Sequence, residues 1–292
     1  MTCNGDSPFL TRSYIVTIHS KLLYNMVTQF EKYLVKANLA KSTVTSYLWT
    51  INYFLEHYKE VNKKNLLAYK GYLMENFKPQ TVNLRLQAMN KFLEFSKQDK
   101  LKMKFVKAQQ KNFLENVISD ADYKFLKSKL KADGYDEWYF IVWFMAATGA
   151  RVSELLQIKA EHVAVGYLDL YSKGGKMRRL YIPKKLRTEA DKWLKEQSIT
   201  SGYLFTNRLG NRLSTRGIAI QLKHFAEKYG LNRDVVYPHS FRHRFAKNFL
   251  DRFNDIALLA DLMGHESIET TRIYLRRTAS EQQKIVDKVV TW

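Results

Sequence analysis

The sequence predicts a mainly α-helical protein with one small β-hairpin, an α+β chain built as two domains. Apolar residues recur at three- and four-residue spacing through most of the 292 residues, which is the period of an amphipathic helix. Apolar and polar residues alternate only around residues 167–182, as is typical of strands. A polar, lysine-rich segment at residues 99–112 separates two helical parts, each long enough to form its own core.

The helical pattern sets the expected domain bounds. We expect an N-terminal extension, a helical domain, a basic linker and a second domain, at residues 1–19, 20–98, 99–112 and 113–292. The first domain shows four helical blocks, at Leu22–Val35, Thr43–Tyr58, Lys64–Phe77 and Thr81–Phe95. Ser42 and either Gln80 or Thr81 stand at expected N-cap positions. Pro79 is expected to end the third block, because proline breaks a helix interior.

The second domain is predicted to place helices on both sides of the hairpin. The first three helices are expected at about 119–131, 137–148 and 152–158. The hairpin turn is Ser-Lys-Gly-Gly-Lys, and its strands are expected at Tyr167–Tyr171 and Arg179–Ile182. Helices resume near Leu186, and the stretch from Thr215 to Val290 is helical in pieces separated at Gly230, Pro238 and Gly264.

The charge of the chain indicates a polyanionic partner. Its 48 Lys and Arg against 28 Asp and Glu give a formal net charge of +20, more than solubility requires. Residues 1–110 carry 17 basic and 7 acidic side chains, so both halves share the excess. Nucleic acid is favoured over a membrane surface, since the longest apolar run, Trp138–Ala147, falls short of the roughly 20 residues that span a bilayer. A lone cysteine, Cys3, and no visible export signal fit a reducing cytoplasm.

A candidate phosphate seat lies around Arg151. Gly149 is expected to end one helix in the left-handed conformation, and Arg151 then opens the next. Its guanidinium would lie near helix-end N–H groups, which also favour an anion. Taken alone, the segment is explained better by an exposed cap residue paired with Glu154.

A second candidate segment begins a helix at Pro238. His239 and Arg242 follow at a spacing of three residues, which puts both on one face, where both can reach one phosphoryl group. His243 is interpreted as a histidine packed near the core with its hydrogen bonds satisfied, rather than as a catalytic group.

A third candidate segment contains a nucleophile. Gly264 closes a helix and leaves His265 at the break, and Tyr274 follows nine residues later. A phenol with an ordinary pKa of about 10 attacks phosphorus well only when cations or a base help to remove its proton. The chain has 18 tyrosines, and most must be ordinary core or surface residues. The spacing from His265 singles out Tyr274 among them.

These segments together resemble the signature of the tyrosine recombinase, or phage integrase, family. The matching motifs are Thr-Gly-Ala-Arg151-Val-Ser-Glu-Leu, His239-x-x-Arg242, Gly264-His265 and Tyr274. They run in the family's order over the whole second domain. The helical first domain resembles the family's SAM-like core-DNA-binding domain, so the resemblance covers nearly all of the chain. It implies two domains that form a C-shaped clamp around DNA.

The resemblance also implies the catalytic residues, which are Tyr274, Arg151, Lys173, His239, Arg242 and His265. The tyrosine would form a 3′-phosphotyrosyl bond, the arginines would clamp the non-bridging oxygens, and the histidines would complete the pocket. Lys173 fits best as general acid for the leaving 5′ oxygen, with Lys176 as its competitor. Glu154 has a supporting role, in which it steers Arg151 or the backbone beside it.

The expected partner is double-stranded DNA. The resemblance implies inverted-repeat core sites, a homotetramer on two duplexes and room for accessory proteins. Neither a metal nor another cofactor is expected, because preorganised cations can stabilise the transition state and the sequence shows neither a carboxylate cluster for magnesium nor a GxxxxGK[ST] loop. Candidates for DNA contact are Lys41, Arg85, Lys91, Lys100, Lys102 and Lys104, although a solvated face is the more ordinary role for any one of them.

Several alternatives stay open at this point. A type IB topoisomerase would share the tyrosine chemistry, and a DNA-binding regulator could keep the fold without the activity, although the complete residue set argues against the latter. The short two-domain layout, with no added N-terminal arm-binding domain expected, is similar to Xer-type resolvases, integron-type integrases and small transposases. Integration, excision, inversion and resolution are not distinguished, and the expected location is the cytoplasm, with the nucleoid. The apolar last helix, Ile285–Trp292, packs either on its own domain or on a neighbouring protomer.

Overall fold

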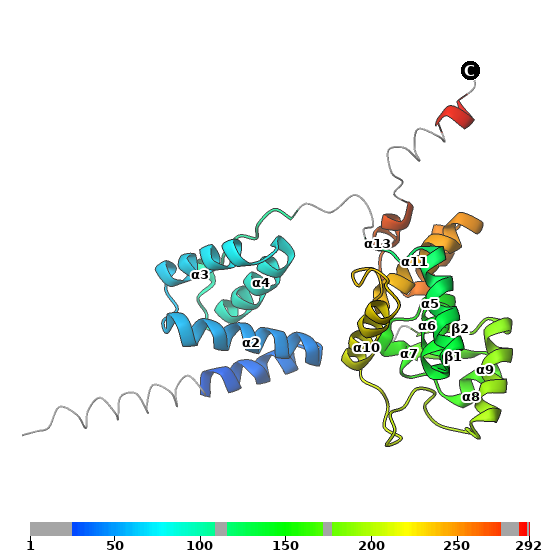
Figure 1. Cartoon of the computed structure of the whole chain (residues 1–292). Helices are drawn as coiled ribbons and strands as arrows, with labels where there is room; N and C mark the ends of the chain where they lie inside the picture. The colour runs from blue at the N-terminus through cyan, green and yellow to red at the C-terminus, as the bar shows by residue number, and fades with distance from the viewer. Residues whose placement is uncertain (1–24, 109–115, 172–176, 276–285, 291) are drawn as a thin grey trace, which may run out of the picture. The chain divides into compact units, whose positions relative to one another are not determined.

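The computed structural model describes residues 25–108, 116–171, 177–275, 286–290 and 292. The chain divides into two compact units, Met1–Gln110 and Lys111–Trp292, and each is described by itself (Figure 1). The described residues form helices and one two-stranded antiparallel sheet, which confirms the predicted fold class. None of the helices in these ranges is both long and apolar enough to cross a bilayer.

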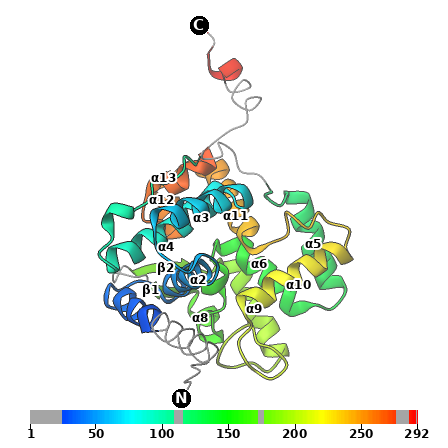
Figure 2. The ribbon, with the colours of Figure 1, turned by 90° about the vertical axis from the view of Figure 1, so that its left-hand side faces the viewer.

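The N-terminal unit is a helical bundle around one apolar core. A helix over residues 25–36 precedes α2 (Lys41–Tyr58), α3 (Lys63–Asn76) and α4 (Pro79–Phe95). The last three lie together in both views (Figures 1 and 2). Their buried residues recur at helical spacing and pack into a single cluster that includes Phe30, Ile51, Phe54, Tyr69 and Phe92. Burial of these faces stabilises helices that propensity alone would leave marginal.

Two predicted helix boundaries in this unit are wrong. α2 begins at Lys41 with Ala40 as its N-cap, so Ser42 lies inside the helix. α3 ends at Asn76, and Pro79 takes the first position of α4 behind an N-cap at Lys78. The reason is that proline lacks only an N–H that a first helical turn leaves unpaired in any case, so it starts a helix as readily as it ends one.

The segment after α4 folds back onto that helix. It opens with the short 3₁₀ helix η1 (Asp99–Leu101). The Asn90 side chain accepts from the Met103 N–H at 2.8 Å and donates to the Met103 carbonyl at 2.9 Å. Asn83 binds Val106 in the same two-way manner, at 2.9 and 3.0 Å. Residues 103–106, predicted to lie in an exposed connector, are therefore pinned to α4.

The C-terminal unit is built around α6. Its described elements are α5 (Asp120–Ala132), α6 (Asp136–Thr148), α7 (Val152–Leu155), α8 (Ala160–Val165), β1 (Tyr167–Tyr171), β2 (Met177–Tyr181), α9 (Lys184–Glu196), α10 (Thr215–Lys228), α11 (Pro238–Arg252), α12 (Ile256–Met263), α13 (Ile268–Arg272) and the 3₁₀ helix η2 (Ile273–Leu275). α6 is apolar all round and packs against α5, α7, α9 and α11, so it forms the centre of the core.

The hairpin and the start of this unit are fixed by specific pairing. β1 and β2 pair antiparallel, with Tyr167 opposite Tyr181 and Tyr171 opposite Met177. The predicted turn, including Lys173 and Lys176, lies outside the described residues. Ahead of α5, the buried Ser240 hydroxyl of α11 accepts from the Ile118 N–H at 2.7 Å, which ties the entry of the chain to α11. α8 was not predicted, because its six residues are too few to show a helical period.

Candidate active site

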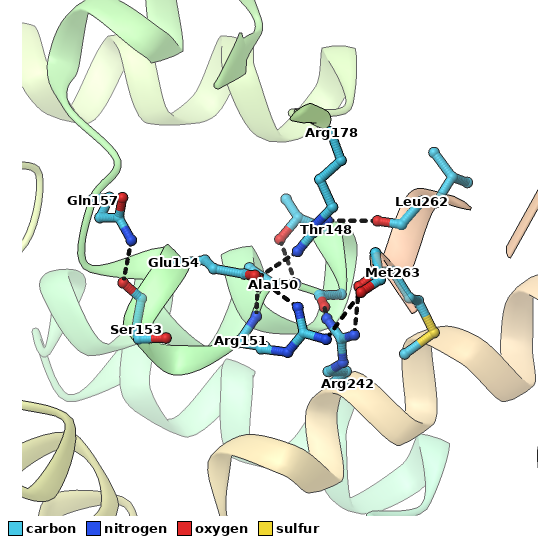
Figure 3. Close-up of polar contacts among 12 residues, drawn as sticks. Thr148, Ala150, Arg151, Ser153, Glu154, Gln157, Arg178, Arg242, Leu262 and Met263 are labelled. Atoms are coloured by element: carbon cyan, nitrogen blue, oxygen red, sulfur yellow. Dashed lines mark hydrogen bonds and ion pairs between the residues drawn. The ribbon is translucent and has the colours of Figure 1, made fainter. Parts of the chain in front are cut away.

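The turn between α6 and α7 presents Arg151. Gly149 ends α6 in the left-handed conformation, and a Cβ at this position would lie 2.4 Å from the Phe245 ring, so only glycine fits. Arg151 is the N-cap of α7. Its backbone N–H donates to Glu154 Oε2 at 2.7 Å, and its guanidinium donates to Glu154 Oε1 at 2.9 Å (Figure 3). The pairing with Glu154 considered from the sequence is present.

Helix α11 carries Arg242 into the interior of the site. Pro238 occupies its first position, as predicted, and Arg242 is only 3% exposed. The Arg242 guanidinium donates to the Gly149 carbonyl at 2.6 Å and to the Met263 carbonyl at 2.7 Å (Figure 3). It therefore joins the end of α6 to the end of α12. Burial lowers the pKa of Arg242 to about 10, a shift to which the nearby Arg151 adds, and the group stays charged near pH 7.

His265 completes this corner through two hydrogen bonds. Its Nε2 lies 3.1 Å from Arg242 Nη2, and its Nδ1 lies 2.8 Å from the Thr271 hydroxyl. Because arginine only donates, Nε2 accepts, and Nδ1 carries the proton of a neutral ring. Burial, followed by the charges of Arg242 and Arg151, lowers the pKa of His265 to about 4, which agrees with the neutral form.

Tyr274 lies in η2 and is buried to 9% exposure. Its ring packs with Ala246, Leu250, Leu259 and Met263 in a small apolar cluster. Its hydroxyl lies 2.9 Å from His243 Nδ1. Burial raises the pKa of Tyr274 to about 12, although the charges of Arg242 and Arg151 act to lower it.

The contact between His243 and Tyr274 was missed by the sequence interpretation. His243 was taken as a packed histidine near the core, and it is largely buried, yet its partner is the hydroxyl of the candidate nucleophile. Burial, together with His239 and Arg242, lowers the pKa of His243 to about 4, so the ring is neutral, and in its Nε2–H tautomer Nδ1 accepts a hydrogen bond from the phenol. The signal available in the sequence was its spacing of four residues from His239, which puts both on one face of α11.

The structure places His239 in the same region as the other described candidate residues. His239 is half-buried beside His243, with ring centroids 6.2 Å apart, and burial followed by the charges of Arg242 and Arg151 lowers its pKa. Arg151, Glu154, His239, Arg242, His265 and Tyr274 thus meet in one region. Among the described residues, no group of three or more His, Cys, Asp or Glu side chains could hold a metal ion.

The predicted DNA-contact residues of the N-terminal unit fall into three kinds. Lys91 and Lys102 pair with Glu94, at 2.6 and 3.5 Å, and Lys102 also pairs with Asp99. Lys41, Lys100 and Lys104 are exposed. Arg85 stacks 4.0 Å above the Trp49 ring, donates to the Thr50 hydroxyl at 2.8 Å, and lines with Lys41 a surface recess of about 630 Å³.

Comparison with known proteins covers almost the whole chain. The phage integrase family matches residues 116–281. The chain is 30% identical to tyrosine recombinase XerA of Pyrococcus horikoshii over 280 residues, which is 90% of this chain and 93% of that protein. A crystal structure of XerA recombinase superposes with a TM-score of 0.52 at 21% identity, covering 90% of this chain and 98% of that one. The Tn1549 transposon integrase bound to transposon right-end DNA gives 0.68 at 14% identity, covering 91% and 99%.

Proposed function

The chain belongs to the phage integrase family and is a tyrosine-type site-specific DNA recombinase, and we propose that Tyr274 is the group that attacks the DNA backbone. One observation carries the assignment. The Tyr274 hydroxyl, buried and bonded to a neutral histidine, lies in the field of Arg242 and Arg151, whose side chains come from distant parts of the chain. A phenol so placed is a nucleophile with a proton acceptor on one side and an anion site on the other.

The arginines are proposed to hold the scissile phosphate. Arg151 keeps 38% of its side chain exposed while two of its nitrogens are anchored, at Glu154 and at the Gly264 carbonyl 3.2 Å away. Its remaining N–H groups can therefore reach a non-bridging oxygen. Arg242 is bound to carbonyls and contributes mainly its charge. His239 and His265 line the same region, in the roles that the family resemblance implies.

The proposed reaction moves one proton at each end of the displaced bond. Tyr274 forms an O–P bond to the phosphate while its proton passes to His243 Nδ1. The P–O5′ bond breaks, and the leaving 5′ oxygen takes a proton, for which we propose Lys173 of the hairpin turn, with Lys176 as the alternative. Attack on the phosphotyrosyl ester by the 5′ hydroxyl of another strand reverses these transfers. The ester keeps the energy of the broken bond, so rejoining needs no nucleotide.

DNA is the partner, as it is in the solved complex of the Tn1549 integrase. We propose that the sites are inverted repeats, that four copies act on two duplexes, that accessory proteins direct the outcome, and that the reaction takes place on the nucleoid in the cytoplasm. For contact with the duplex we propose Lys41, Arg85, Lys91, Lys100, Lys102 and Lys104. The net charge of +20 supports binding through phosphates, which weakens as salt rises.

A nicked substrate tests this assignment. Duplexes that bind the purified full chain are selected from a random-sequence pool, and a nick beside the cleavage point lets the 5′ fragment escape, which traps the covalent complex. The wild type is expected to accumulate the covalent complex and to release a fragment with a free 5′ hydroxyl. Tyr274→Phe is expected to form no complex, and the control Tyr229→Phe is expected to form as much complex as the wild type. Trapping by Tyr274→Phe would contradict the proposal, and relaxation of plasmids without any preferred site would favour a topoisomerase.

A further inference from the structure

Three arginines from three elements converge on the carboxyl end of α12. The last carbonyls of this helix and its cap accept one arginine each, in sequence order. Arg178 donates to Leu262 at 2.6 Å, Arg242 to Met263 at 2.7 Å and Arg151 to Gly264 at 3.2 Å (Figure 3). Carbonyls at a helix end carry partial negative charge, so they hold cations without cancelling a full charge. Two of these arginines belong to the proposed phosphate site, and Arg178 has no role in it so far.

Arg178 is held as tightly as the other two. It lies on β2, its side chain is 13% exposed, and its second terminal nitrogen pairs with Glu154 Oε2 at 2.5 Å. Its stem passes against Gly264, where a Cβ would lie 2.2 Å from Arg178 Cδ. Gly264 has a φ of +61°, so glycine is required there both for its backbone conformation and for the approach of Arg178.

Glu154 is shared between two arginines. Oε1 accepts from the Arg151 guanidinium, whereas Oε2 accepts from the Arg151 backbone N–H and from Arg178. The Glu154 side chain is 12% exposed, so this carboxylate has little water to screen it. Burial acts to raise the pKa of Glu154, but the hydrogen bond and charge of Arg178, with those of Arg151, bring it below the ordinary value. Glu154 is thus an anion beside the proposed phosphate site, and Arg178 is its counter-ion.

We propose that Arg178 is a positioning residue of the active site, which occupies Glu154 so that the Arg151 guanidinium remains free to bind the scissile phosphate. The proposal rests on the function assigned above to Tyr274 and Arg151. With Arg178 in place, two guanidiniums are bonded to one carboxylate. Without it, Glu154 has only Arg151 as a charged partner, and the DNA phosphate must compete with a buried carboxylate for that arginine.

The neighbouring arginine provides a matched control. Arg179 comes from the same strand, but it pairs with Asp169 at 2.8 and 2.9 Å and stacks 3.8 Å from the Tyr167 ring. Its partners belong to β1 alone, so its loss would weaken the hairpin without changing the charge around Glu154. Any effect of Arg178 beyond that of Arg179 is an effect on the site.

The test combines Arg178→Met with Glu154→Gln, because the second substitution is expected to offset part of the effect of the first on the cleavage rate. Cleavage of the selected nicked duplex is measured at saturating protein for the wild type, Arg178→Met, Glu154→Gln, the double variant and Arg179→Met. Methionine keeps an unbranched stem against Gly264. If Arg178→Met fails to fold, Arg178→Lys takes its place in the comparison. We expect Arg178→Met to slow cleavage about 100-fold, a size typical of small misplacements of catalytic groups. Glu154→Gln should restore part of this loss, because it removes the competing charge, and Arg179→Met should cleave nearly as fast as the wild type.

The outcomes separate this proposal from the function on which it rests. If the wild type forms no complex through Tyr274, the proposed function fails. If the wild type cleaves but Arg178→Met cleaves equally fast, or if the double variant is no faster than Arg178→Met, then Arg178 has only a structural role and the inference is overturned. If Arg178→Lys is used in place of Arg178→Met, the inference is overturned when adding Glu154→Gln to Arg178→Lys does not speed cleavage.

Discussion

The cations at the end of α12 and those on the surface of the N-terminal unit are anchored by different partners. At the end of α12, Arg151, Arg178 and Arg242 are bound by backbone carbonyls, with Glu154 as the only carboxylate bonded to them among the described residues. On the surface of the N-terminal unit, Lys91 and Lys102 pair with carboxylates, and the hydrogen bond from Lys91, with Tyr33 and Lys102, lowers the pKa of Glu94 to about 2. A carbonyl fixes a cation and leaves its charge available, whereas a carboxylate neutralises it. We propose that this difference separates a site that stabilises a transition state from a surface that only attracts DNA.

The largest expected effect is at Arg242. Lysine keeps the charge but has one nitrogen in place of the two that donate to Gly149 and Met263, so the fork that holds the charge near Tyr274 is lost. We expect Arg242→Lys to cleave the nicked duplex about 100- to 1000-fold more slowly than the wild type, with DNA affinity little changed. A rate within tenfold of the wild type would mean that the carbonyl anchors do not matter, and the contrast between the units would lose its basis.

The next effect is on stability, at Gly264. Gly264→Ala forces a side chain into a left-handed conformation and against Arg178 Cδ. We expect the free energy of unfolding in urea to fall by about 2–3 kcal/mol. Gly230→Ala is the matched control, since its φ is +66° and nothing lies within 4 Å of the added Cβ, so it should lose only about 1 kcal/mol. Equal losses would show that Arg178 does not pack tightly at this end of α12.

A smaller effect concerns the buried histidines of the site. His243 and His265 have pKa values of about 4 in the folded chain, against about 6.5 when unfolded. Between pH 6.5 and 4 the unfolded chain therefore binds more protons, and the free energy of unfolding decreases as pH falls through this window. We expect about 1 kcal/mol from each after screening by solvent. His243→Asn should flatten the profile of urea midpoints against pH, and an unchanged profile would contradict the neutral state of this ring.

The smallest effect is expected on the N-terminal surface. Lys41 is exposed, whereas the Lys91 ammonium lies 2.6 Å from a Glu94 oxygen. If both face DNA, Lys41→Ala should reduce the slope of log affinity against log salt by about 1, because one phosphate contact is lost. Lys91→Ala should change the slope less, since Glu94 already balances its charge. A larger change for Lys91 would show that DNA displaces the carboxylate and would weaken the contrast between the units.

The sequence pattern predicted those features of the fold that depend on neighbouring residues alone. The hairpin, the helix start at Pro238 and the left-handed ends at Gly149 and Gly264 follow from residue spacing and backbone preference. The candidate site residues could also be identified from the sequence, because their motifs follow one another in the order of the family's signature. Pro79 was misassigned because proline marks either end of a helix, and the local sequence does not say which.

Pairing between distant segments could not be predicted. Arg178 stands just before the strand expected from the sequence and was given no role, yet its partners are Glu154, 24 residues away, and the Leu262 carbonyl, 84 residues away. His243 was assigned to the core because its partner, Tyr274, lies 31 residues further along. Both contacts depend on how α11, α12 and β2 pack, and a single sequence without its fold carries no information on that packing.

The residue that becomes linked to DNA defines the chemistry of the site. Proteolysis of the trapped complex, followed by mass spectrometry of the nucleotide-bearing peptide, tests it most directly. We predict one adduct, on Tyr274, joined through a 3′ phosphate. An adduct on any other tyrosine, or a phosphate link to the 5′ end of the DNA, would contradict the arrangement of Tyr274, His243 and the two arginines proposed here.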